Sequence, residues 1–400
     1  MPTFNDPSLT AVWFGKQASE GTQAATLYQL RALPPTLSTQ VSSVQSVRPI
    51  SGRTGARDTI RTSVGGGGDW SFEFGSDEFD LILEAALGAA VVATGITLAV
   101  TCTVSTPGTD LVRYTSASST EFATLAVGDY IRTAVSTSAS NNGWFPVVAK
   151  ESTGEWIEVV NPDGFATGPE NLLTFDFDER LVIGGDKPFL TIEIEDRDPT
   201  PAILATELYI DQLVATFGMT FAQSALINCT TTFSGKAPTA GVAQQRTGSP
   251  GAAFTSRALN SHDDVVSVGW YNGSAGYSFK NKIPQASWTI DNGVGQQLVV
   301  GQIGPAAVAQ DIPTLSGTVN LLIENDRLLT EILGTANSTS VFGIGCSEGL
   351  GTTGNISYGF SLTGAKLIDL GRGQDAQNLP FFRSASLGAT GIVITKYSEA

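Results

Sequence analysis

The chain has 400 residues, of which 41% are hydrophobic and only 15% charged, against about 25% charged residues in an average soluble protein. This length has room for two or three domains of about 100–200 residues each. Its 38 acidic and 22 basic residues give a net charge of −16, which argues against a cationic groove that binds nucleic acid through its phosphates. A weakly charged, polar surface suits a protein that becomes covered by copies of itself, although an ordinary secreted β-protein has the same composition.

The sequence shows no signs of secretion, disulfide bonding or membrane insertion. The cysteines Cys102, Cys229 and Cys346 are odd in number and far apart, which indicates neither a disulfide framework nor a zinc site. The first residues lack the cationic start and apolar run of a secretory signal, so we expect synthesis in a cytoplasm. The most apolar stretch, residues 81–100, is interrupted by Glu84 and by glycines, so we expect no membrane span.

Residues 41–69 show no convincing strand pattern and end in the glycine run 65–68, so we expect a long loop. Positive charge gathers in this loop. Its arginines are candidates for contacts with carboxylates of a neighbouring copy, and a solvated loop is the other interpretation. They are Arg48, Arg53, Arg57 and Arg61.

A strand followed by a short helix comes next. Residues 70–74 alternate aromatic and polar side chains, which predicts a strand with one buried face. Residues 77–87 carry acids in their first turn, an apolar stripe and then Gly88, which predicts an amphipathic helix that ends at the glycine.

Residues 92–182 are expected to form an inserted β-domain, because connections this long usually carry structure of their own. Alternating segments around 98–100, 127–131, 144–148 and 156–159 predict a small antiparallel barrel or an Ig-like sandwich. The sequence Asn-Asn-Gly at 141–143 predicts a hairpin turn, since these residues tolerate positive φ.

The strand-and-helix unit then appears a second time. Residues 190–195 and 226–233 read as strands, and residues 237–261, rich in small and polar residues, read as a linker. Residues 319–323 predict a strand, 326–333 a helix that ends at Gly334, and 341–344, 356–362 and 392–394 further strands. We therefore expect a mainly β chain with two tandem domains, each a β-sandwich or barrel with one short α-helix: 1–91 with 183–236, and 262–400.

No constellation of residues indicates catalysis, a metal or a cofactor. His262 is the only histidine and adjoins the expected linker. A catalytic triad would have to use this one residue, and a metal site with several histidines is excluded. Carboxylate pairs such as Asp176 with Asp178, or Asp263 with Asp264, lack a calcium-loop signature and read as solvated. The glycine-rich segments have the wrong spacing for a phosphate-binding loop. We expect no enzyme and no cofactor.

The duplicated unit and the inserted β-domain together resemble the two-domain tail tube proteins of siphophages. The residues that carry the likeness are 68–74 leading to 80–88, and 122–131 followed by 141–145. The resemblance implies a virion protein with its curved sheets lining the tube and its helices outside. It also implies homotrimeric, pseudo-hexameric rings that stack into a hollow tail tube. DNA would pass through without specific binding, and the partners would be the tape measure protein, the tail terminator and the distal tip proteins.

A negatively charged wall would repel passing DNA, so acids beside the repeated strands are candidates for the lumen. They are Glu73, Glu193, Glu195 and Glu324. A phage receptor-binding, baseplate or capsid decoration protein is the alternative, because such proteins are also rich in β-strands and free of catalytic motifs.

Overall fold

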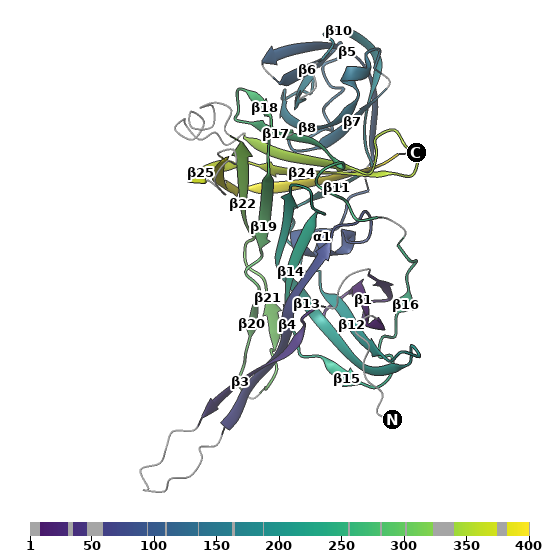
Figure 1. Cartoon of the computed structure of the whole chain (residues 1–400), viewed down its shortest axis with the longest axis vertical. Coiled ribbons are helices and arrows are strands. Elements are labelled where there is room, and N and C mark those ends of the chain that lie inside the picture. The colour runs from purple at the N-terminus through teal and green to yellow at the C-terminus, as the bar shows by residue number, and fades with distance from the viewer. Residues whose placement is uncertain are drawn as a thin grey trace.

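Strands dominate the chain, as the alternating pattern predicts, and the mainly β fold class is confirmed (Figure 1). The computed structural model describes residues 9–30, 35–45, 59–93, 95–108, 110–134, 136–161, 165–186, 188–254, 257–280, 282–300, 302–322, 340–373 and 382–399. The expected second helix at 326–333 lies outside these described residues.

Eight antiparallel strands form the central sheet, called here the eight-strand sheet. From edge to edge they are β3 (Ser38–Gln45), β4 (Thr59–Glu73), β14 (Asn228–Gly235), β13 (Ile203–Ala222), β19 (Gln285–Asp291), β22 (Thr314–Leu322), β26 (Phe382–Ala389) and β25 (Lys366–Gly373). Strands expected in both tandem domains thus belong to one continuous sheet. The expected domain boundaries remain a prediction.

Two further layers pack around this sheet. The first half of β13 bends away to pair with other strands, which are β12 (Leu190–Arg197), β15 (Thr239–Gly241) and, beyond β12, β1 (Ala11–Lys16), β2 (Thr26–Gln29) and the parallel β16 (Ser249–Pro250). A separate six-stranded sheet contains β11 (Glu179–Val182), β27 (Gly391–Ser398), β24 (Ile356–Thr363), β23 (Val341–Ser347), β17 (Val265–Tyr271) and β18 (Gly276–Ser278).

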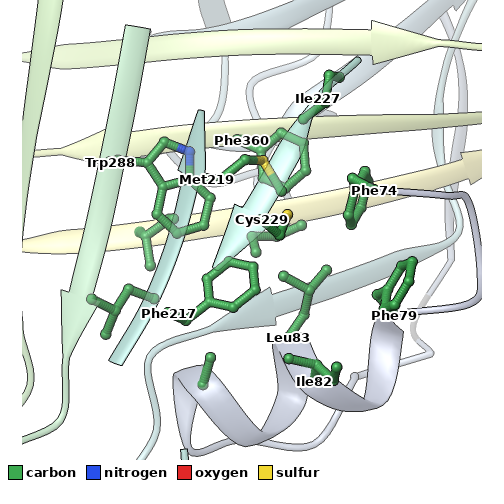
Figure 2. Close-up of a cluster of buried hydrophobic side chains, with 14 of the residues drawn as sticks. Phe74, Phe79, Ile82, Leu83, Phe217, Met219, Ile227, Cys229, Trp288 and Phe360 are labelled. Atoms are coloured by element: carbon green, nitrogen blue, oxygen red, sulfur yellow. The ribbon is translucent and has the colours of Figure 1, made fainter. Parts of the chain in front are cut away.

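The predicted helix forms as α1 (Asp80–Leu87) and ends at Gly88, which adopts φ 62° as a left-handed cap. Its apolar stripe is buried: Ile82 and Leu83 point into the main core toward Phe217 and Cys229 of the eight-strand sheet (Figure 2). Phe360 of β24 and Trp288 of β19 close the same core. The helix therefore covers the apolar face of the sheet.

The expected loop at 41–69 is wrong in part, because its ends are the paired strands β3 and β4. The glycines hide the strand pattern from the sequence, since they have no side chains to alternate. They are required by close packing: a Cβ on Gly66 would lie 2.3 Å from the Lys236 carbonyl oxygen, and one on Gly68, at φ 158°, 2.3 Å from that of Thr36. The segment 46–58 lies outside the described residues.

A closed six-stranded barrel lies at one end of the molecule (Figure 1). Its strands are β5 (Ile96–Gly108), β6 (Leu111–Ser116), β7 (Tyr130–Ala134), β8 (Gly143–Lys150), β9 (Trp156–Val160) and β10 (Gly168–Phe177). They fall within the expected insertion. β7 and β8 pair as expected, but their connection is longer than an Asn-Asn-Gly turn and includes the 3-10 helix η2 (Ala139–Asn141). Asn141 is buried there and donates to Glu170 at 2.8 Å, a tertiary contact that no local turn signal reveals.

Glycines on the six-stranded sheet let the barrel approach closely. A Cβ on Gly359 would lie 2.1 Å from the Tyr130 ring, and one on Gly345 2.7 Å from it. Beside them, Trp144 of the barrel donates from Nε1 to the Tyr358 carbonyl oxygen at 3.0 Å. The barrel is therefore seated on the sheet by buried aromatic rings.

Candidate assembly surfaces

One face of the eight-strand sheet is lined by hydroxyl groups and glycines. Cross-strand partners share a face, and a row across six strands shows its character. That row is Ser71, Thr230, Gly218, Thr289, Ser316 and Gly388. Hydroxyls also join neighbouring strands: Ser287 Oγ lies 2.8 Å from Thr318 Oγ1, and Thr232 donates to Asp69 at 2.7 Å. We call this the hydroxyl face.

The other face of the same sheet is apolar. A row one residue along contains Phe72, Cys229, Met219, Trp288, Gly317 and Leu387. The five side chains in it are buried in the core that α1 covers. This strict alternation specifies the register in which the strands pair, because a shift of one residue would turn the apolar side chains of a strand to the exposed face. The hydroxyl face is thus the face left to solvent or to another molecule.

Carboxylates are sparse on the hydroxyl face. Glu73, a predicted lumen acid, is exposed there at the end of β4, opposite Asn228. Asp69 and Asp291 are exposed on the same face. Alternation in the sequence does not single them out, because Asp69 follows the glycine run 65–68 within β4 and Asp291 is the last residue of β19. Glu324 lies outside the described residues.

Glu193 and Glu195, expected to face the lumen, are not exposed to solvent. Both side chains are fully buried, and both contact the guanidinium of Arg246, at 2.6 Å for Glu193. Arg197 adds a second contact to Glu195 at 2.5 Å, and Arg246 lies 3.8 Å from the centre of the Trp13 ring. The segment 237–254, part of the expected linker 237–261, supplies this arginine and covers the two acids, which a pattern of local alternation cannot reveal.

Both edges of the eight-strand sheet are open in the part of the chain that the structure describes. β3 pairs with β4 alone, and β25 pairs with β26 alone. An open edge presents unpaired N–H and C=O groups, which readily pair with a strand of another chain. The sheet therefore ends in two potential attachment points.

Two hairpins extend side by side from the end of the sheet opposite the barrel (Figure 1). One is β3 with β4, and the other is β20 (Gly295–Gln297) with β21 (Ala307–Ala309). The Val64 N–H donates to the Ile303 carbonyl oxygen at 2.8 Å and joins them. Large apolar side chains on the two hairpins are exposed: Val41, Val44, Leu298, Val299, Val300 and Ile303. We call this set the arm patch.

One of the four predicted inter-subunit arginines lies in a described part of the first hairpin. Arg61 lies in β4 and is exposed. Arg48, Arg53 and Arg57 lie outside the described residues. The connection they occupy is basic in a chain of net charge −16, because residues 46–58 hold three arginines and one acid.

The histidine, cysteine and acidic side chains of the described residues form no metal-binding cluster. No group of three or more histidine, cysteine or acidic side chains among them is placed to hold a metal ion. His262 is exposed and contacts its exposed neighbour Asp263 at 2.7 Å, while Asp264 is bound by Arg257 at 2.5 Å. Burial raises the pKa of the Cys102 thiol to about 12, so it is not a ready nucleophile. No described helix is long and apolar enough to cross a membrane.

One comparison with known proteins identifies a family. The family model described as phage tail tube protein matches residues 7–381, which is nearly the whole chain. A search of curated proteins finds no match.

Proposed function

Because the chain belongs to the phage tail tube protein family, we propose that its copies close into rings that stack as the hollow tail tube of a siphophage. The family is structural, and the protein is a component of the virion tail. The tube would conduct DNA from the capsid to the host, and its ends would meet the tape measure, tail terminator and distal tip proteins. The observation that carries the proposal is an eight-strand sheet with one buried face, one hydroxyl face and two open edges.

The hydroxyl face is the best candidate for the tube lumen. The hydroxyls and glycines of the row offer passing DNA no cationic group to bind, and exposed carboxylates repel its phosphates. Lys366 of β25, opposite Gly388, is an exposed cation at the margin of this face. Glu73 is retained as a lumen candidate, joined by Asp69 and Asp291. Glu193 and Glu195 are withdrawn, since both are buried and paired with Arg246, and Glu195 also with Arg197.

Stacking of the rings is assigned to the arm patch. The exposed apolar side chains of the arm patch are costly to leave in water, so a second molecule should cover them. Positive charge in the first hairpin complements the acidic remainder of a neighbouring copy and would steer the contact. A head-to-tail contact of this kind does not close and so produces a filament.

The test is negative-stain electron microscopy of the purified protein over a range of concentrations, together with its mass in solution. We expect rings and hollow tubes of uniform width. Val300→Asp should leave rings but reduce stacking, because it places a charge in the arm patch; Val242→Asp, at an exposed valine of the segment 237–254, is the matched control. A discrete closed oligomer at every concentration, without tubes even when the phage's tail chaperones and tape measure are supplied, would refute the proposal.

A further inference from the structure

We propose that β25 of one copy pairs antiparallel with β3 of a second copy in one defined register: Asp369 opposite Gln40, Gly371 opposite Ser38 and Gly373 opposite Thr36. The inference rests on the proposed function and deepens it, because it states which strands join the copies and how they align. It comes from an internal repeat whose own seam shows how two units are joined.

The same order of strand pairing occurs twice in the chain. In the first repeat, β1 pairs with β2 and β12, β12 with β13, β13 with β15 and β14, β14 with β4, and β4 with β3. In the second, β17 pairs with β18 and β23, β23 with β24, β24 with β27, β25 with β26, β26 with β22, and β22 with β19. The long β13 thus corresponds to β24 and β25 together, and β3 corresponds to β19.

Register irregularities align β13 with β25 residue by residue. The β13–β14 ladder shifts by one between Val214 and Thr216, and the β25–β26 ladder shifts by one between Leu367 and Asp369. Superposing the two shifts makes Thr216 equivalent to Asp369. Gly218 is then equivalent to Gly371.

The neighbouring ladders align β3 with β19 in the same way. Through β14 and β26, Asp69 becomes equivalent to Thr318. Their hairpin partners follow from the β3–β4 and β19–β22 ladders, so that Ser38 is equivalent to Thr289.

The two hairpins provide an independent check on this alignment. Val44 lies opposite Ile60 in the first, and Gly295 lies opposite Ala309 in the second. The alignment places these two pairs at equivalent positions. In each hairpin the pairing register shifts by one residue before the pair is reached, and the two shifts agree. The repeat is therefore preserved along the described strands of both hairpins as far as Val44 and Gly295.

The seam between the repeats supplies the rule for joining units. β13 pairs antiparallel with β19, with Thr216 opposite Asp291 and Gly218 opposite Thr289. The seam residues Thr216, Gly218 and Thr220, with their partners Asp291, Thr289 and Ser287, each have an equivalent on an open edge. Replacing β13 by β25, and β19 by the β3 of another copy, gives the proposed register.

The open edges have the backbone groups that this pairing needs. The Thr36 N–H donates to the Asp69 carbonyl oxygen on the β4 side, and backbone groups alternate along a strand. Leu37 and Thr39 therefore direct their N–H and C=O groups to the open side, where β25 would lie. Ser38 and Gly371 become a non-hydrogen-bonded pair with Cα atoms about 4.5 Å apart, a separation that a disulfide can span.

The test is a disulfide between copies in the assembled protein, with Ser38→Cys and Gly371→Cys in one chain. The native cysteines Cys102, Cys229 and Cys346 are buried, so their background should be low. We expect mild oxidation of assembled protein to link most copies, and the largest linked species on a non-reducing gel gives the ring size. Ser38→Cys with Leu370→Cys is the matched control, since a one-residue slip places the two side chains on opposite faces.

The outcomes separate this inference from the proposed function. Tubes whose copies link only in the slipped pair, or in neither pair, overturn the inference and leave the tube function standing. Linked rings that never stack support the inference and refute the tube. A chain that stays monomeric at every concentration refutes both.

Hydrogen exchange on the unaltered protein gives a readout that does not depend on the folding of any variant. On assembly, the amides of Leu37 and Thr39 should exchange at least about tenfold more slowly, because they gain strand partners. Amides of the β13–β19 seam should not change, since they are already paired within the chain. Unchanged exchange at Leu37 and Thr39 in assembled protein would overturn the inference.

Discussion

Phe217 and Trp288 lie with ring centroids 5.5 Å apart on opposite sides of the seam where β13 pairs with β19. Both are buried, and Phe360 of the six-stranded sheet packs on Trp288 with ring centroids 5.9 Å apart. The junction between the two repeats is thus filled by aromatic rings from three strands. We infer that the repeats depend on each other for stability.

Trp288→Ala should reduce the free energy of unfolding by about 3–5 kcal/mol, because it leaves a large cavity in the seam. Urea denaturation of unassembled protein, followed by circular dichroism, measures this change. Thr289→Ala is the control: the threonine is exposed on the hydroxyl face, and its loss should change stability by less than about 1 kcal/mol. A loss below about 1 kcal/mol for the tryptophan would contradict a tightly packed seam.

Arg246→Met should reduce the free energy of unfolding by about 3–5 kcal/mol, because Glu193 and Glu195 would remain buried with less compensating charge. The same denaturation experiment measures it. Adding Glu193→Gln and Glu195→Gln to this variant should restore much of the loss, since neutral amides cost less to bury than carboxylates. If the triple variant is no more stable than Arg246→Met, the buried charges are not the cause.

Gly359→Ala should weaken the packing of the barrel against the six-stranded sheet, because the new Cβ would lie 2.1 Å from the buried Tyr130 ring. We expect a loss of at least about 2 kcal/mol in the free energy of unfolding, together with faster proteolysis between the barrel and the sheet. Gly185→Ala is the matched control, because its Cβ meets nothing within 4 Å. Equal stability of the two variants would show that the barrel does not depend on this contact.

The sequence was sufficient to predict elements whose pattern is local. The strand at 70–74 and the helix that ends at Gly88 follow from apolar periodicity and a helix-terminating glycine, and both are present. The strands at 190–195 and 356–362 follow from alternation in the same way.

What the sequence could not predict depends on distant partners. The glycines at 65–68 become part of a strand because β3 and β14 pair with it, and glycine leaves no pattern to read. Glu193 and Glu195 alternate like solvated residues, yet Arg246, about fifty positions away, covers them. Candidate site residues chosen from alternation alone therefore included buried acids and missed Asp69 and Asp291.

The Asp176 carboxyl on β10 of the barrel makes the stability of the folded chain depend on pH. Burial raises its pKa to about 6, against partial relief from Thr97 and Arg132, and Asp178 and Glu399 add negative charge nearby. The pKa of Asp176 in the folded chain thus lies above its ordinary value of 3.8. Between pH 3.8 and about pH 6, the folded state therefore carries more bound protons than the unfolded state. The stability that protonation contributes is complete below about pH 4 and is lost as the pH rises through about 6.

Asp176→Asn removes this titration while keeping the shape of the side chain. The variant should match the original protein at pH 4 and exceed it at pH 8 by up to about 3 kcal/mol in the free energy of unfolding. Urea denaturation of unassembled protein at both pH values measures the difference. Asp263→Asn, at an exposed carboxyl, is the matched control for the exchange of a carboxylate for an amide. Equal gains at pH 4 and pH 8 would mean that the asparagine acts through packing, and ionisation of a buried Asp176 would then not limit the stability of the barrel.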